Sequence, residues 1–175
     1  VPELSGVGTH NLTVKSSDGK KIAYSLYMFD SNSYVYDDEG NELGYDCVHK
    51  DQIDWYKNTS AQLKAQNGGK TVNAMAFQHI IVQEIYEMMF YEFPFVLGEA
   101  TLNFDGQSYT YLPYVYNIKD GFLLEAPCPG YYNYGQFDAF VETGDVVAVF
   151  SGHDHFNSFT VEKDGVDIVN TPSCT

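Results

Sequence analysis

Apolar and polar residues alternate over residues 11–14 and again over residues 21–29, and the turn-forming run Ser16-Ser17-Asp18-Gly19 separates the two stretches. Alternation with a period of two is typical of half-buried strands, and a glycine-containing turn between them predicts a hairpin. Residues 31–47 are rich in Asp, Asn, Gly and Tyr and have no sustained period, so we expect a surface loop there.

Helical and strand-like patterns then alternate along the chain. A helical stripe over residues 51–66 stops at Asn67-Gly68-Gly69, a sequence typical of helix ends. Continuous apolar runs of strand length follow, separated by shorter helical stripes, which favours an α/β fold with added hairpins. The expected elements are strands at 71–77, 145–150, 158–162 and 166–170, helices at 82–90 and 135–142, and a hairpin turn at Lys163-Asp164-Gly165, whereas residues 91–129 show no readable period.

Length and composition predict one globular domain over residues 1–175. The chain is 44% hydrophobic and 16% aromatic, enough to build a core, and it contains no repeat or linker. No apolar run approaches the roughly 20 residues of a membrane span, and residues 1–8 do not resemble a signal peptide. We therefore expect no membrane partner.

The charge balance narrows the classes of ligand. The formal net charge is -15, and all nine basic residues are lysines. Nucleic acid is excluded as a partner, because its phosphates are neutralised by clustered Lys and Arg. Without arginine, a phosphoryl ligand lacks the planar bidentate clamp that proteins commonly use, so metal ions would have to hold it.

The cysteines and the N-glycosylation sequons say little about the cellular compartment of the protein. Cys47, Cys128 and Cys174 are odd in number, far apart and without a CxxC pair, which favours unpaired thiols over a disulfide or a zinc knuckle. Two N-x-S/T sequons begin at Asn11 and Asn58. An extracytoplasmic or secreted location is favoured over the alternatives.

Three of the five histidines directly follow predicted buried strands. His79 comes after the strand at 71–77, and His153 and His155 come after the strand at 145–150. Ligands of open α/β sheets gather at the carboxyl ends of strands, and Gly152 would permit the turn that brings a His-x-His pair to one point. Neutral imidazole is a ligand for zinc, iron and similar ions, although a histidine at such a position is also commonly a plain hydrogen-bonded or exposed residue.

The sequence resembles the calcineurin-like metallophosphoesterases, in particular their purple-acid-phosphatase-like branch. The motifs occur in the family's order over most of the chain, and Gly-His-Asp-His-x-Asn is the specific one. The matching segments are LYMFDS at 26–31, DQIDWY at 51–56, AFQHI at 76–80 and VFSGHDHFN at 149–157.

The resemblance implies a fold, a reaction and a set of ligands. The fold would be part of the family's four-layer α/β/β/α sandwich, and the reaction would be hydrolysis of a phosphomonoester or phosphodiester on a small molecule or phosphoprotein. Two metal ions of Fe, Zn or Mn would act, with His79 and His153 on one ion and His155 on the other.

Departures from the family pattern limit these implications. The family's Asp-x-His, Gly-Asp-x-x-Asp and Gly-Asn-His-Asp/Glu strings do not occur here, and Ile81 stands where the family usually has Pro. The resemblance therefore implies that the chain corresponds to a C-terminal half, which alone would bind metal weakly or not at all. A missing half would also leave a sheet face exposed, through which homo-oligomers could form.

Other polar residues have two interpretations each. Asp154 is either a carboxylate that tunes the flanking histidines or a solvated loop residue. Asn157 either orients the loop or caps a turn. Gln78 either lines a pocket or is an ordinary loop residue. Two rival functions stay open: a non-catalytic scaffold or acidic, tyrosine-rich module that binds carbohydrate or protein, and a mononuclear hydrolase with Asp154 or Glu84 as base.

Overall fold

A computed structural model describes residues 4–89, 100–104, 107–111 and 117–174. Eleven strands and three helices are formed by these residues. In chain order they are β1 (His10–Lys15), β2 (Ile22–Met28), β3 (Tyr34–Tyr36), β4 (Glu42–Tyr45), α1 (Lys50–Gln66), β5 (Ala74–Phe77), α2 (Ile85–Met89), β6 (Ala100–Phe104), β7 (Gln107–Tyr111), β8 (Ile118–Phe122), α3 (Gln136–Thr143), β9 (Val146–Ser151), β10 (Ser158–Lys163) and β11 (Val166–Asn170).

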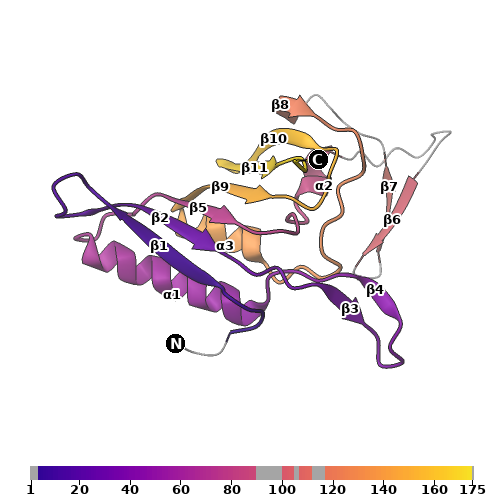
Figure 1. Ribbon diagram of the computed structural model, residues 1–175, viewed down its shortest axis with the longest axis horizontal. Helices are drawn as coiled ribbons and strands as arrows, with labels where there is room; N and C mark the ends of the chain where they lie inside the picture. The colour runs from indigo at the N-terminus through magenta and orange to yellow at the C-terminus, as the bar shows by residue number, and fades with distance from the viewer. Residues whose placement is uncertain (1–3, 90–99, 105–106, 112–116, 175) are drawn as a thin grey trace.

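A mixed seven-stranded sheet forms the centre of the molecule, in the order β1-β2-β5-β9-β11-β10-β8 (Figure 1). The four middle strands, β2, β5, β9 and β11, run parallel, and the outer strands pair antiparallel. This arrangement confirms the predicted α/β class and both predicted hairpins. The β10–β11 turn has positive φ at Asp164 (50°) and Gly165 (82°), the geometry that a tight two-residue turn requires.

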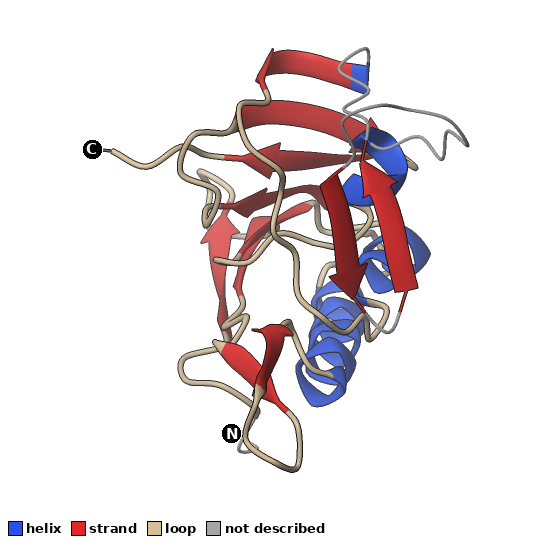
Figure 2. Ribbon diagram, turned by 90° about the vertical axis from the view of Figure 1, so that its right-hand side faces the viewer, coloured by secondary structure: helices blue, strands red, loops and turns tan. Residues whose placement is uncertain are grey.

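All three helices lie on one side of the sheet (Figure 2). The core forms where α1 and α3 cover the middle strands, because most buried residues of β2, β5, β9 and β11 lie on that side. Its central row crosses the sheet through Tyr27, Ala76, Val149 and Ile168. The described residues thus supply one helical layer and one sheet layer of the implied sandwich.

A buried carboxylate ties the helices to the sheet. Asp145, directly before β9, is 2% exposed, and its oxygens accept hydrogen bonds from the hydroxyls of Thr143, Tyr56 and Tyr27. Burial, followed by the negative charge of Asp145, raises the pKa of Tyr56. The hydroxyl protons therefore stay in place and satisfy a charge that would otherwise be costly to bury.

Two expectations about individual elements are wrong. Residues 31–47 are not a plain loop, because β3 and β4 form an antiparallel hairpin there. The second helix is shorter than predicted, starting at Ile85 and described only to Met89; position 90 lies outside the described residues. Residues 91–129 showed no hydrophobic period, and the described residues among them include the strands β6, β7 and β8.

The three cysteines are free in the structure. Cys47 and Cys128 are half-buried, and burial raises the pKa of the Cys47 thiol to about 12. No helix among the described residues has the length and apolarity of a membrane span.

Candidate metal-binding site

The histidine site lies at the carboxyl ends of two neighbouring parallel strands. Phe77 at the end of β5 is paired with Phe150 on β9, and their rings stack with centroids 5.1 Å apart. Backbone pairing continues beyond the strands, since Gln78 N–H donates to Phe150 O (3.0 Å) and Gly152 N–H donates to His79 O (3.1 Å). The two histidine-bearing loops are thereby held side by side.

The side chains of His79 and His153 meet at this edge. His79 Nε2 lies 3.2 Å from His153 Nδ1, and the two rings are nearly perpendicular, with centroids 5.0 Å apart. Two imidazole nitrogens bound to one tetrahedral ion at about 2.0–2.1 Å would be about 3.3–3.4 Å apart. The two nitrogens form a hydrogen bond in the structure, and their separation is close to that of two ligands of a single ion, which would have to replace this bond.

Backbone strain is concentrated on His153. Its φ is 71°, and Asp154 N–H donates to Gly152 O (2.8 Å) across it, so His153 is the central residue of a γ-turn of the rare positive-φ type. We predicted that Gly152 would make this turn, but the positive φ falls on the histidine instead. A non-glycine residue keeps such a conformation only where its surroundings enforce it, which is common at functional sites.

The surroundings of His153 favour its neutral form. Its pKa is lowered mainly by burial, and further by the nearby His79 and His155. The ring of Tyr45 packs edge-on against it, with centroids 4.2 Å apart. Neutral imidazole is the metal-binding state, so His153 need not lose a proton to bind an ion near neutral pH.

His155 is close enough to lower the pKa of His153, but its ring makes no hydrogen bond with the pair among the described residues. It is exposed, and its backbone carbonyl accepts a hydrogen bond from Ser173 N–H (3.0 Å). Within the described part of the chain, no three His, Cys, Asp or Glu side chains form a cluster able to hold a metal ion. The structure therefore brings two of the three candidate ligands together, and metal binding by all three stays a prediction.

Asn157 and Asn170 hold the loop that carries the histidines. The fully buried Asn157 accepts hydrogen bonds from Leu124 N–H (2.9 Å) and Glu125 N–H (3.0 Å), and its amide donates to Glu125 O (3.0 Å). The Asn170 amide donates to the backbone carbonyls of Asp154 (3.1 Å) and Asn157 (3.0 Å). Asn157 thus orients the loop, and Asn170 is a second support that the sequence analysis missed.

Asp154 is buried, so its interpretation as a solvated loop residue is wrong. Its Oδ1 accepts Cys128 N–H (3.0 Å), and its Oδ2 is buried with no hydrogen-bond partner among the described residues. Burial raises the pKa of this carboxyl to about 7. Its carboxylate accepts the backbone N–H of Cys128 and makes no hydrogen bond to an imidazole among the described residues.

Gln78 points away from the histidine pair. Its amide donates to Ile80 O (2.7 Å) and accepts from Gln136 Nε2 (2.6 Å). Gln78 and the buried Glu84 line a cavity of about 20 Å³, which is room for one water molecule. This cavity is too small for a substrate.

A larger pocket opens beside the histidine pair. It has a volume of about 150 Å³ and is lined by His79 and His153 together with Tyr34 and Tyr45 of the β3–β4 hairpin. The sequence analysis missed both tyrosines, because residues 31–47 carry no strand pattern.

Comparison with known proteins supplies the relatives of this chain. No protein-family model matches it. Among curated proteins of Arabidopsis thaliana, it is 27% identical to probable inactive purple acid phosphatase 14, over 95% of this chain and 37% of that protein. It is 26% identical to probable inactive purple acid phosphatase 29, over 94% of this chain and 38% of that protein. The chain therefore spans little more than a third of the length of these relatives.

A solved structure agrees with the sequence relatives at the level of the fold. A crystal structure of a dimetal phosphatase from Danio rerio matches with a TM-score of 0.51 and 8% identity, covering 94% of this chain and 49% of that one. Identity this low shows the fold alone. The chain is thus a relative of purple-acid-phosphatase-like proteins, with a fold of the calcineurin-like metallophosphoesterase superfamily.

Proposed function

We propose that this chain supplies histidine ligands to a metal site that hydrolyses phosphate esters. The observation that supports this proposal is the 3.2 Å separation of His79 Nε2 and His153 Nδ1 at the ends of adjacent parallel strands. The names of the relatives, purple acid phosphatases and a dimetal phosphatase, support a phosphatase-like metal site. The resemblance adds His155 as a ligand of a second ion.

Metal would supply what the chain's own residues lack. A bound ion polarises a phosphoryl oxygen and generates a nucleophile from water at neutral pH. Without arginine, and with a net charge of -15, the chain has no other strong holder for a phosphate. His79 and His153 would hold the ion, Asn157 and Asn170 would fix the loop, and the ring of Tyr45 would limit the rotation of His153.

Metal titration of the purified chain tests this proposal without requiring activity. We expect Co²⁺, followed by its visible absorption, to bind with at least about tenfold lower affinity in His79→Ala and His153→Ala, because each variant loses one ligand. His10→Ala is the matched control, since His10 is also exposed but lies on β1, where its ring contacts Gly8 O. Unchanged affinity in both site variants would refute the proposal.

A second candidate is a phosphoesterase-like domain that binds metal but does not hydrolyse phosphate esters. The names of the three curated relatives, which call those proteins probably inactive, favour it. Hydrolysis of 4-nitrophenyl phosphate by the metal-loaded protein separates the two candidates. Turnover that disappears in His153→Ala supports the first, and metal binding without turnover supports the second.

A further inference from the structure

The pocket beside the histidine pair has the size of one aromatic ring. Its volume of about 150 Å³ equals that of an engineered apolar protein cavity that binds benzene. One wall is formed by His79 and His153, so a ring in the pocket would lie next to the nitrogens proposed to hold metal. This inference therefore rests on the proposed function and concerns the alcohol part of its substrate.

Aromatic rings form a continuous wall from the hairpin to the histidines. Tyr34 and Tyr45 lie with centroids 5.2 Å apart and a 31° angle between their planes, and Tyr45 meets His153 edge-on at 4.2 Å. The Tyr34–Tyr45 separation lies in the range of about 4.5–7 Å at which aromatic pairs attract beyond simple burial. A further ring entering the pocket would find both faces and edges to pack against.

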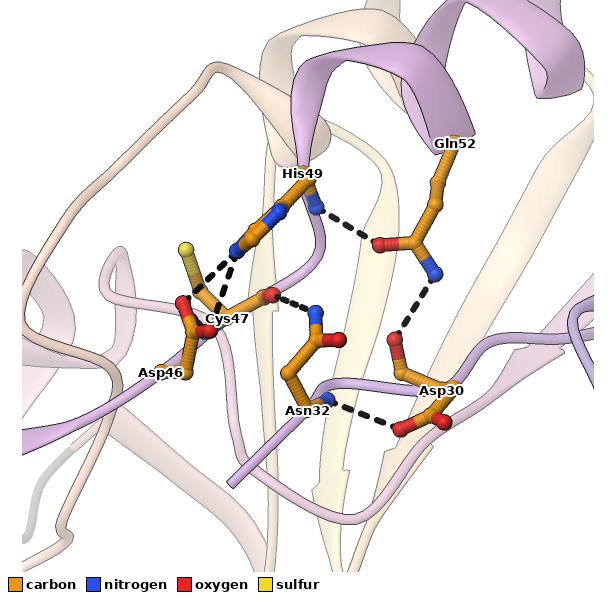
Figure 3. Close-up of polar contacts among 6 residues, drawn as sticks. All are labelled: Asp30, Asn32, Asp46, Cys47, His49 and Gln52. Carbon is orange, nitrogen blue, oxygen red and sulfur yellow. Dashed lines mark hydrogen bonds and ion pairs between the residues drawn. The ribbon is translucent and has the colours of Figure 1, made fainter. Parts of the chain in front are cut away.

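The hairpin that carries the tyrosines is fixed at its base. Asp46 N–H donates to Ser33 O (3.0 Å), and the Asn32 amide donates to Cys47 O (2.7 Å). Figure 3 shows that the same base is tied to the end of β2, where Asp30 accepts Asn32 N–H (2.8 Å). Tyr34 and Tyr45 are therefore positioned before any ligand arrives, which reduces the entropy lost on binding.

Charge further limits what the pocket accepts. None of the residues that line it is Lys, Asp or Glu, and the chain as a whole carries a net charge of -15. A carboxylate or second phosphate on the alcohol part would be repelled and would find no cation among these lining residues. An uncharged ring meets neither obstacle.

We propose that the pocket formed by Tyr34 and Tyr45 binds an uncharged aromatic ring in the alcohol part of a phosphate ester whose phosphate lies at His79 and His153. The site would thus prefer aryl or arylalkyl esters over aliphatic esters of similar size. Tyr34 would act as a specificity-determining residue, because it is 42% exposed and contacts the ligand without supporting the core.

Binding of non-hydrolysable phosphonates to the Co²⁺-loaded chain tests the preference. We expect benzylphosphonate to bind about 2- to 10-fold more tightly than butylphosphonate by calorimetry, and Tyr34→Leu to remove most of this difference. Phe122→Leu is the matched control, because Phe122 is an exposed aromatic residue on β8 that does not line the pocket. Equal affinity for the two phosphonates in the unmodified chain would overturn the inference.

A metal-free arm separates this inference from the proposed function. Ligand-observed NMR with benzyl alcohol should show binding to the metal-free chain that Tyr34→Leu abolishes and that His155→Ala leaves in place, because His155 does not line the pocket. Failure of Co²⁺ binding with this signal intact would refute the metal site and keep the aromatic pocket. If Co²⁺ binds normally but neither the phosphonates nor benzyl alcohol reveal a preference for an aromatic ring, the aromatic pocket is refuted and the metal site is not.

Discussion

Glu84 is a buried acidic residue whose ionisation should affect stability. It is 7% exposed and accepts a hydrogen bond from Asn133 Nδ2 (2.8 Å). Burial is the main cause that raises its pKa above the ordinary value of 4.5. A carboxyl with a raised folded-state pKa contributes its full stability below the unfolded pKa, and that contribution is lost as pH rises through the folded pKa.

Replacement of Glu84 by glutamine should therefore flatten the pH dependence of stability. We expect the urea unfolding free energy of the unmodified chain to fall relative to that of Glu84→Gln between pH 5 and 8. This range lies above the calculated isoelectric point of 4.4, so the chain stays soluble. Glu87→Gln serves as control because Glu87 is exposed; an identical pH trend in the unmodified chain and Glu84→Gln would contradict the prediction.

At the residue scale, sequence position predicted the histidines but not their supports. His79 and His153 follow apolar strands, and parallel neighbours bring such positions to one edge. Tyr45 and Asn170 reach the site from separate elements, a hairpin and the end of β11, and no local pattern marks them. The burial of Asp154 depends on the backbone of residue 128, which is equally invisible to local sequence reasoning.

At the scale of elements, Gln52 joins the start of α1 to β2 (Figure 3). Its amide donates to Asp30 O (2.8 Å) and Thr9 Oγ1 (2.7 Å) and accepts His49 N–H (2.8 Å), and the residue is fully buried. Gln52→Ala would leave these partners unsatisfied, so we expect a loss of about 1–3 kcal/mol in unfolding free energy, measured with urea.

A glutamine elsewhere on the same helix provides the comparison. Gln62 is exposed on α1, and Gln62→Ala should change the unfolding free energy by less than about 0.5 kcal/mol. Equal effects of the two substitutions would show that the Gln52 contacts do not stabilise the start of the helix.

The elements that were predicted share a feature that the β3–β4 hairpin lacks. Apart from β1, whose Leu12 and Val14 are exposed, each predicted strand or helix places apolar residues in the core. The hairpin lies largely outside the core, with Tyr34, Tyr36 and Leu43 exposed, so burial imposes no alternation on it. Its turn is instead fixed by Asp37, which accepts Glu39 N–H (2.9 Å) and Asn41 N–H (2.8 Å).

At the scale of the whole molecule, the sheet has a face opposite the helices (Figure 2), and apolar side chains are exposed on its strands. Leu12 and Val14 on β1 are 52% and 47% exposed, and Val147 on β9 is 38% exposed. Leu12 pairs with Leu26, whose neighbour Tyr27 is buried under the helices, so Leu12 and Leu26 face the open side. Exposed apolar residues on a sheet face favour association with another surface.

We expect the purified chain to self-associate through this face, against the repulsion of its net charge of -15. Sedimentation velocity should show the dimer fraction rising from 0.1 to 1 M NaCl, because the screening length falls from about 10 to about 3 Å. Leu12→Lys with Val14→Lys should restore the monomer, since two charges on the face must be desolvated for the copies to meet. Val141→Lys, on the exposed side of α3, should leave association unchanged. A monomer at every salt concentration would show that the half-buried residues between β2 and β9 cover this face well enough alone.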